Sequence, residues 1–166
     1  MVNFMIFVTV GSQKFQFNRL LKALDKLVGE GKIKDSIFAQ IGYSTYIPKN
    51  YRYKAFLNRN EFISYEKEAN IVITHGGTGA IIGAVKAHRK VIAVPRLKKF
   101  GEHVDNHQLQ ILAEFKQLNI IDVCKNCDNL DRAIREVKKK EFKEYKSNTD
   151  TIINSIGKFI DNRGIQ

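Results

Sequence analysis

The most constraining feature of this sequence is a strand, a glycine-rich turn, a helix and a second strand in direct succession over residues 71–95. Ile71 to Ile73 form a short β-branched run, which is typical of a strand buried on both faces. Apolar residues then recur at helical spacing, and Val91 to Val94 form a second buried-type run that Pro95 stops. A parallel crossover of this kind is right-handed in almost every known case. The chain is therefore expected to fold around a parallel β-sheet.

The turn in this unit reads His75-Gly76-Gly77-Thr78-Gly79, with three glycines in four positions. Glycines let the backbone come close to a ligand and adopt positive φ. The free N–H groups at the start of the following helix favour an anion, usually phosphate. The turn therefore predicts a phosphate-bearing ligand, such as a nucleotide, at the carboxyl end of the sheet. Tight packing also places glycines between a strand and a helix, so the turn alone leaves both interpretations open.

The dinucleotide-binding fingerprint G-x-G-x-x-G is matched only loosely, because Gly79 is followed by Ala80, Ile81 and Ile82. The segment after the second strand is also basic, with Arg96, Lys98 and Lys99, and offers no carboxylate for a ribose. The sequence therefore argues against NAD as the ligand.

Two further polar segments are expected at the same edge of the sheet. The first is Gly11-Ser12-Gln13, which follows a buried-type strand from Met5 to Val10. A plain strand-to-helix connection explains it equally well. The second is Asp105-Asn106-His107-Gln108, which opens a helix, with Asp105 or Asn106 as its expected cap. Packing for His107 and solvation for Gln108 are the alternatives to a site role.

The remaining elements follow from hydrophobic periodicity. Strands are predicted over residues 37–41, 51–57 and 120–123, and helices over residues 17–28, 58–69, 109–118 and 130–137. An apolar stripe on a C-terminal helix at about residues 145–162 packs on its own domain or docks a partner; it comprises Ile152, Ile153, Ile156, Phe159 and Ile160. The pattern predicts a single α/β domain over residues 1–166, with an open, mostly parallel sheet and helices on both faces.

Composition narrows the functional class. Lys and Arg total 28 against 17 Asp and Glu, a net charge of +11, which indicates a solvated basic surface or attraction to nucleotide phosphates, nucleic acid or an anionic membrane. No nucleic-acid motif is present, and the aromatic residues are not interleaved with the basic ones, so nucleic acid is disfavoured. No apolar run approaches ~20 residues and no secretory signal is apparent, so a cytoplasmic protein is expected.

Cys124 and Cys127 have C-x-x-C spacing. A structural zinc site needs four ligands, and no second pair exists. The motif also lies late in the chain, away from the expected central helix start. Two reduced bystander thiols are therefore favoured over a redox pair.

Taken together, the sequence resembles the donor-binding C-terminal domain of the family 28 glycosyltransferases, the group that includes MurG. The likeness is strongest to small single-domain members, namely the catalytic subunit of the two-subunit N-acetylglucosaminyltransferase of dolichol-linked glycan assembly and the capsule and exopolysaccharide proteins of PssE type. The matching segments run in family order: FVTVGSQ (Phe7–Gln13), QIGYSTY (Gln40–Tyr46), ANIVITHGGTGA (Ala69–Ala80), KVIAVPR (Lys90–Arg96) and EHVDNHQ (Glu102–Gln108).

The resemblance implies a Rossmann-like fold and half of a GT-B glycosyltransferase. The implied reaction moves a hexose or N-acetylhexosamine from a UDP-sugar to a polyprenyl-diphosphate-linked acceptor, in capsule, exopolysaccharide or related glycan synthesis. A membrane-anchored partner subunit would supply the acceptor site and hold this chain at the cytoplasmic face of the membrane. A non-catalytic stabilising partner of a complete transferase, and an unrelated nucleotide-binding Rossmann protein, are the alternatives.

The resemblance also implies roles for individual residues. The two glycine turns would face the donor diphosphate through Gly11, Ser12, Gln13, His75, Gly76, Gly77, Thr78 and Gly79. The later segment would line the sugar and phosphate side through Glu102, His103, Asn106, His107 and Gln108. His75 is the local candidate for a catalytic role, with the general base expected on the partner. Neither a metal nor a cofactor is expected. Where many relatives carry a ribose-binding carboxylate, this chain has Gly83.

Overall fold

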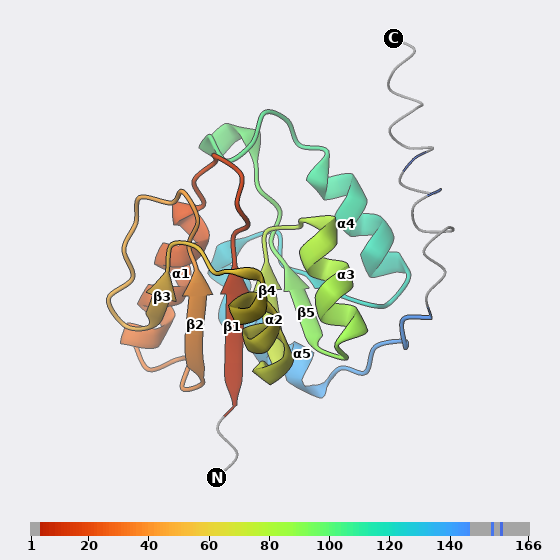
Figure 1. Ribbon diagram of the computed structural model, residues 1–166, viewed down its shortest axis with the longest axis horizontal. Helices are drawn as coiled ribbons and strands as arrows, with labels where there is room; N and C mark the ends of the chain where they lie inside the picture. The colour runs from red at the N-terminus through yellow and green to blue at the C-terminus, as the bar shows by residue number, and fades with distance from the viewer. Residues whose placement is uncertain (1–3, 147–153, 155–156, 158–166) are drawn as a thin grey trace.

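The computed structural model describes residues 4–146 together with Asn154 and Gly157 (Figure 1). The expected apolar stripe from Ile152 to Ile160 lies outside the described residues.

Among the described residues, the core of the fold is one sheet of six parallel strands in the order β3-β2-β1-β4-β5-β6. The predicted open, mostly parallel sheet is thus confirmed. The strands are β1 (Met5–Thr9), β2 (Ser36–Gln40), β3 (Arg52–Lys54), β4 (Ile71–Thr74), β5 (Lys90–Ala93) and β6 (Asp122–Val123). The central strands are β-branched and buried on both faces, as their sequences predict.

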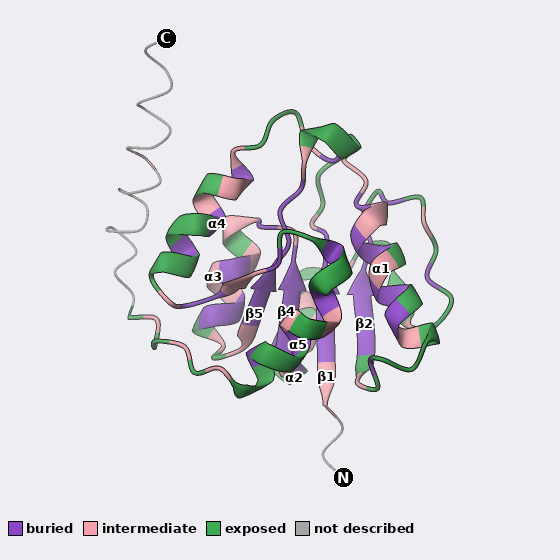
Figure 2. Cartoon of the chain, turned by 180° about the vertical axis from the view of Figure 1, so that it is seen from behind, coloured by how far each residue is buried: buried purple, intermediate pink, exposed green. Residues whose placement is uncertain are grey.

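Helices cover both faces of this sheet, as Figures 1 and 2 show from opposite sides. The long helices are α1 (Asn18–Gly29), α2 (Arg59–Glu68), α3 (Thr78–Lys86), α4 (Gln108–Gln117) and α5 (Leu130–Lys139); two short 3₁₀ turns are η1 (Lys98–Phe100) and η2 (Cys127–Asn129). Alternate residues of each strand feed two cores. Ile6 and Val8 pack with α1 and α5, while Phe7 packs with α2, α3 and α4.

The edge strands are shorter than predicted. The strand expected over residues 51–57 spans only Arg52–Lys54, because the Leu57 amide leaves the ladder and donates to Gln40 Oε1 at 3.0 Å. The strand expected over residues 120–123 spans Asp122–Val123, which pair with the last two residues of β5.

The strand order places β1 beside β4, although β2 and β3 lie between them in the sequence. Strand β1 pairs with β2 on one side and with β4 on the other. From β1 the chain continues to β2 on one side of this pair, and from β4 it continues to β5 on the other side. In open parallel sheets, the crevice outside the carboxyl ends of such strands is where ligands bind. The fold therefore directs attention to the turns that follow β1 and β4.

Candidate functional site

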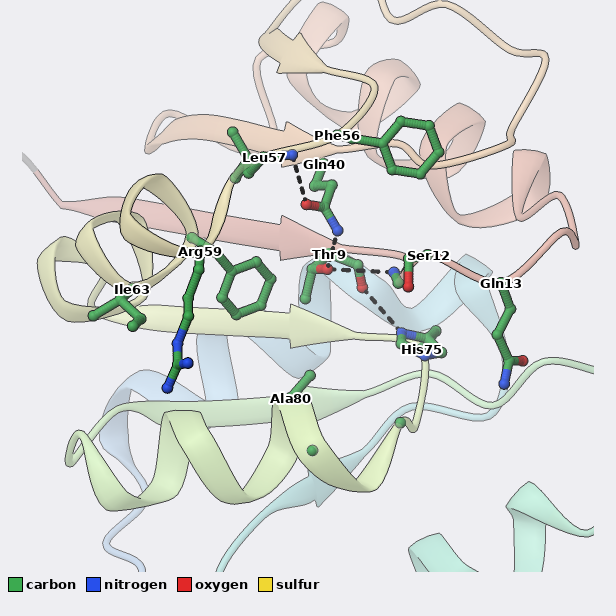
Figure 3. A pocket seen from close by; sticks show the side chains of 14 residues that line it. Thr9, Ser12, Gln13, Gln40, Phe56, Leu57, Arg59, Ile63, His75 and Ala80 are labelled. Atoms are coloured by element: carbon green, nitrogen blue, oxygen red, sulfur yellow. Dashed lines mark hydrogen bonds between the residues drawn. The ribbon is translucent and has the colours of Figure 1, made fainter.

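A pocket of about 580 Å³ lies where the turns after β1 and β4 converge (Figure 3). One side is polar or glycine-rich and comes from the ends of β1, β2 and β4. The other side is mainly apolar and comes from the segment before α2 and from the facing sides of α2 and α3. The lining residues are Thr9, Gly11, Ser12, Gln13, Gln40, Phe56, Leu57, Arg59, Phe62, Ile63, His75, Gly77, Gly79 and Ala80.

The His75 imidazole lies between the two glycine turns. A Cβ atom built on Gly11 would lie 2.6 Å from His75 Cε1, and one built on Gly77 would lie 2.6 Å from His75 Nε2. Gly11 also has φ of +78°, a conformation that side chains disfavour. Both glycines are therefore required by the histidine ring itself, apart from any ligand.

His75 is neutral at physiological pH. Burial of the ring, with a smaller contribution from the Arg96 guanidinium, lowers the pKa of His75 to about 4. Nδ1 lies 3.4 Å from the Thr9 carbonyl oxygen, which can only accept a hydrogen bond. A proton on Nδ1 satisfies this contact, and Nε2, beside the two glycine turns, is then an acceptor. The Thr74 hydroxyl oxygen also lies 3.4 Å from Nδ1. His75 thus brings no positive charge to the pocket.

The pocket floor is a chain of hydrogen bonds between strand ends (Figure 3). Leu57 N–H donates to Gln40 Oε1 at 3.0 Å, and Gln40 Nε2 donates to Thr9 Oγ1 at 3.3 Å. Gly11 N–H donates to the same hydroxyl at 3.3 Å. The Gly11 N–H is therefore occupied within the chain and is not free to meet a phosphate.

Other backbone donors at the pocket remain open. Ser12 and Gln13 N–H groups have no hydrogen-bond partner in the described part of the chain. Helix α3 begins at Thr78 after an N-cap glycine, Gly77, that provides no side-chain cap. The first N–H groups of a helix lack intrahelical partners and carry the positive end of its dipole. This arrangement suits an anion such as a phosphate.

The opposite wall offers apolar surface and one charge. Phe56 is 45% exposed and packs edge-on against Tyr43, with ring centroids 5.1 Å apart. Leu57 and Ile63 extend this surface toward α2. The guanidinium of Arg59, in the first turn of α2, has no hydrogen bond or ion pair to any described residue. An aromatic plane and a free guanidinium thus stand across the pocket from the glycine turns.

The residues expected from the later segment lie in the loop between β5 and α4 and at the first residue of α4, outside the pocket lining. Glu102 is fully buried, and both of its carboxylate oxygens accept hydrogen bonds from Arg19 at 2.9 Å. Gln108 is buried under the glycine turn, 3.3 Å from where a Cβ on Gly76 would stand, and its Oε1 accepts the Arg96 N–H at 3.0 Å. This loop therefore supports the turn from below.

The start of α4 differs from the prediction. The helix begins at Gln108 with His107 as N-cap, and no side chain makes a capping hydrogen bond. The expected caps have other partners: Asp105 Oδ1 accepts the His107 N–H at 3.0 Å, and Asn106 Oδ1 accepts the Lys98 N–H at 3.0 Å. Both side chains stabilise the loop before the helix instead of the helix itself.

The model of the glycosyltransferase family 28 C-terminal domain matches residues 5–162, nearly the whole chain. The chain belongs to this family. No curated protein sequence matches it significantly.

Solved structures agree with a family 28 C-terminal fold. The glycosyltransferase of kitacinnamycin superposes with a TM-score of 0.62 at 16% identity, covering 83% of this chain and 35% of that chain. MurG from Acinetobacter baumannii gives 0.58 at 16% identity, with coverages of 83% and 42%. The solution structure of ALG13 gives 0.58 at 16% identity, and covers 93% of this chain and 94% of its own. The chain thus spans about a third of the first enzyme and nearly all of ALG13.

Within this family 28 domain, the structure brings together six of the predicted donor-site residues in one pocket: Gly11, Ser12, Gln13, His75, Gly77 and Gly79. Gly76 and Thr78 belong to the same turn. Four others lie in the loop between β5 and α4, and Gln108 is the first residue of α4; the donor-binding roles of all five stay predictions. The four in the loop are Glu102, His103, Asn106 and His107.

Sequence reasoning missed the opposite wall of the pocket and most of its floor, formed by Thr9, Gln40, Phe56, Leu57 and Arg59. The positions of Thr9 and Gln40 in the sequence could have predicted their contact. Both residues end neighbouring parallel strands, so they meet at one edge of the sheet.

Arg96 was also missed, although it connects two segments beside the pocket. Its side chain is 1% exposed, and Nη1 donates to the Phe15 carbonyl at 2.8 Å while Nη2 donates to the Val10 carbonyl. The guanidinium also lies over the Phe17 ring, 5.3 Å from its centroid. Burial lowers the pKa of Arg96 to about 10, so it remains charged near neutrality. It ties the segment after β5 to the turn after β1.

The two cysteines are buried and are not joined by a disulfide. Arg19 Nη1 donates to Cys127 Sγ at 3.2 Å, and Cys124 Sγ donates to the Asn126 carbonyl at 3.1 Å. Burial raises the pKa of both thiols to about 11, which keeps them in the unreactive protonated form.

Among the described helices, none combines the length and apolar character needed to cross a bilayer.

Proposed function

We propose that this chain is the catalytic, donor-binding subunit of a two-subunit glycosyltransferase that uses a UDP-sugar. The observation that carries the proposal is the pocket at the β1/β4 crevice, with open backbone donors on one side and an aromatic wall on the other. Membership of family 28 supports a nucleotide-sugar as the ligand.

The two sides of the pocket suit the two ends of a nucleotide. The diphosphate would lie against the Ser12 and Gln13 amides and the start of α3, where unpaired N–H groups and the helix dipole favour negative charge. The base would lie against Phe56, whose exposed ring offers a stacking surface. Arg59 also lines the pocket and would contribute a cation from its wall.

The chemistry then follows from charge development. The acceptor hydroxyl attacks the anomeric carbon, the bond from that carbon to the diphosphate oxygen breaks, and UDP leaves with added negative charge. Fixed N–H donors stabilise that charge in the transition state, so the step is proposed to need neither metal nor cofactor. His75 Nε2 can accept a hydrogen bond or proton, and the base that activates the acceptor is assigned to the partner.

The proposed partner is a membrane-anchored subunit that binds a polyprenyl-diphosphate-linked acceptor at the cytoplasmic membrane face. The matched enzymes carry more than half of their length outside the matched domain, and here a second chain would supply the equivalent part. The proposed product is an intermediate of capsule, exopolysaccharide or a related glycan, built by transfer of a hexose or N-acetylhexosamine.

A thermal-shift screen against UDP, UDP-sugars, GDP-sugars, NAD and ATP tests the ligand class. A ligand present at 100 times its dissociation constant stabilises the fold by about 2.7 kcal/mol, so a clear rise in Tm is expected with UDP compounds alone. The absence of any UDP shift, with the isolated chain and again with the partner present, would refute the proposal.

Gly77→Val separates a catalytic subunit from a non-catalytic stabilising partner. The new side chain enters the space of His75 Nε2, so UDP binding and transfer should be lost while the chain still assembles with its partner. Gly31→Ala is the control, because Gly31 lies after α1, outside the pocket lining, and a Cβ there meets nothing within 4 Å. Transfer that survives Gly77→Val would favour the stabilising role.

A further inference from the structure

The loop between β2 and β3, residues 41–51, contains no helix or strand and runs beside α1 (Figure 1). It leaves the sheet at the pocket, where Gln40 ends β2. Tyr43 in this loop meets the Phe56 ring edge-on, with an angle of 70° between the ring planes and 5.1 Å between the centroids. Tyr43 is 49% exposed and Phe56 is 45% exposed, so few other contacts fix either ring. The loop therefore supports the aromatic wall of the pocket.

Asn18, the first residue of α1, holds the part of the loop that follows Tyr43. Its Oδ1 accepts the N–H groups of Thr45 and Tyr46, each at 3.0 Å. Its Nδ2 donates to the Thr45 hydroxyl at 2.8 Å. An irregular loop has no backbone ladder of its own, so its N–H groups need partners of this kind.

Asp25 lies two turns further along α1, on the same face as Asn18, and holds the next part of the loop. Asp25 is only 3% exposed. Its carboxylate accepts the Lys49 N–H at 2.9 Å, the Asn50 N–H at 2.8 Å and the Tyr46 hydroxyl at 2.6 Å. Burial acts to raise the pKa of Asp25, but these hydrogen bonds outweigh it and lower the pKa below its ordinary value. The carboxylate is therefore charged, and its hydrogen bonds are of the strong, charge-assisted kind.

These two side chains fix the loop over residues 45–50. Every backbone N–H of this span that has a hydrogen-bond partner donates to Asn18 or to Asp25. The loop is thus held to α1 by side chains and not by backbone pairing. Loss of either side chain should leave the loop, and with it Tyr43, in several orientations.

The start of the loop is held in a different way. The N–H groups of Ile41 and Gly42 donate to the carbonyls of Lys54 and Ala55 at 3.0 and 2.8 Å. Gly42 also packs on the first glycine turn, because a Cβ there would lie 2.6 Å from the Gly11 carbonyl oxygen. Since these contacts do not involve α1, weakening the hold of α1 should alter the aromatic wall and spare the glycine turns.

We propose that Asn18 and Asp25 are positioning residues for the base of the nucleotide donor. Neither residue lines the pocket. They act by fixing the loop, and through Tyr43 they keep the Phe56 ring in one orientation before the ligand arrives. A wall that is ordered in advance binds more tightly, because less ordering accompanies binding. The inference rests on the proposed function, in which the base lies against Phe56 and the diphosphate against the glycine turns.

Calorimetry with UDP and with inorganic pyrophosphate, the latter in competition with UDP, tests the two ends of the ligand separately. Asp25→Asn and Asn18→Ala should each weaken UDP binding roughly threefold or more and leave pyrophosphate binding unchanged. Asp131→Asn is the matched control, because Asp131 pairs with Arg135 on α5 and lies outside the pocket lining. It should bind both ligands as the wild type does. Asn18 is only half-buried, so Asn18→Ala provides the test if Asp25→Asn does not fold.

The same titrations in a Phe56→Ala background distinguish positioning of the wall from general damage to the fold. Phe56→Ala alone should weaken UDP binding, and adding Asn18→Ala or Asp25→Asn should then weaken it no further. The inference is overturned by a further loss in that background, by an equal loss of UDP and pyrophosphate binding, or by variants that bind UDP as the wild type does. None of these results contradicts the proposed function. A wild-type chain that binds no UDP, alone and with its partner, refutes the proposed function and this inference together.

Discussion

The turns after β1 and β4 and the loop between β5 and α4 lie at the same edge of the sheet but are shaped by different interactions. The turns require glycine at two positions, because the His75 ring fills the space that a side chain at Gly11 or Gly77 would need. The loop is shaped by side chains that reach far along the sequence, such as Glu102 to Arg19 and Arg96 to Phe15. Adding a side chain should therefore destabilise the turns, and removing a hydrogen-bonding or charged partner should destabilise the loop.

The largest effect is expected from adding a side chain at Gly11. Gly11→Val should lower the free energy of unfolding by about 3 kcal/mol or more, because backbone strain of about 1–3 kcal/mol adds to the collision with His75. Urea denaturation measures it, and UDP affinity should fall in parallel. Gly31→Val is the control, since Gly31 has a similar φ of +70° but nothing within 4 Å of its Cβ position. Equal losses in both variants would mean that the His75 contact has no cost.

The next effect comes from removing a partner in the loop. Glu102→Gln should cost about 2 kcal/mol, because it leaves Arg19 without the charge of a buried carboxylate while keeping part of the hydrogen bonding. Chemical denaturation measures this cost. Glu136→Gln breaks the exposed pair with Arg132 and should change stability by less than about 0.5 kcal/mol. If the two variants were equally stable, the loop would not depend on its ion pair.

Acid should act on the turns through His75. Because the pKa of His75 falls from 6.5 to about 4 on folding, between these pH values the unfolded chain binds a proton at His75 and the folded chain does not. The contribution of neutral His75 to the free energy of unfolding is complete above pH 6.5 and is lost as the pH falls toward 4. His75→Gln should flatten the dependence of Tm on pH in this window, as scanning calorimetry can measure. An unchanged slope would show that His75 is not protected from protonation.

The smallest effect is expected behind the glycine turn, where the Glu66 carboxylate of α2 faces Gly83 of α3. A Cβ on Gly83 would lie 2.7 Å from Glu66 Oε1, and the Glu66 carboxylate has no hydrogen bond or ion pair to a described residue. Burial raises the pKa of Glu66 above 4.5, so its contribution to stability is largest below pH 4.5 and is lost as the pH rises through the raised value.

Glu66→Gln should therefore stabilise the chain by less than about 1 kcal/mol at pH 7, since it removes a buried charge without a partner. The gain should disappear at low pH, where Glu66 is protonated. Thermal unfolding at pH 4 and pH 7 measures both. A loss of stability at pH 7 would mean that the Glu66 charge has a favourable partner.

The same contrast explains what the sequence could reveal. Each strand of the sheet, and the glycine turn after β4, followed from local pattern, because β-branched runs and consecutive glycines act on their own neighbourhood. The function of Glu102 in the loop did not follow, since its partner Arg19 lies 83 residues away. Local periodicity also predicted caps at Asp105 and Asn106, and competing contacts in the loop overrode both. The opposite pocket wall was missed because Phe56 and Arg59 gain meaning only once β2 and β3 are placed.

The short edges of the sheet limit how this domain can meet another protein. On one side β3 has three exposed residues, two of them basic, and on the other β6 has two residues, with the Asp122 carboxylate held by Lys116 and Lys140. Short, charged edges discourage a foreign strand from extending the sheet. A partner is thereby directed away from β-augmentation and toward contacts between side chains. Two proteins that join in this way can exchange or separate without either backbone ladder being broken.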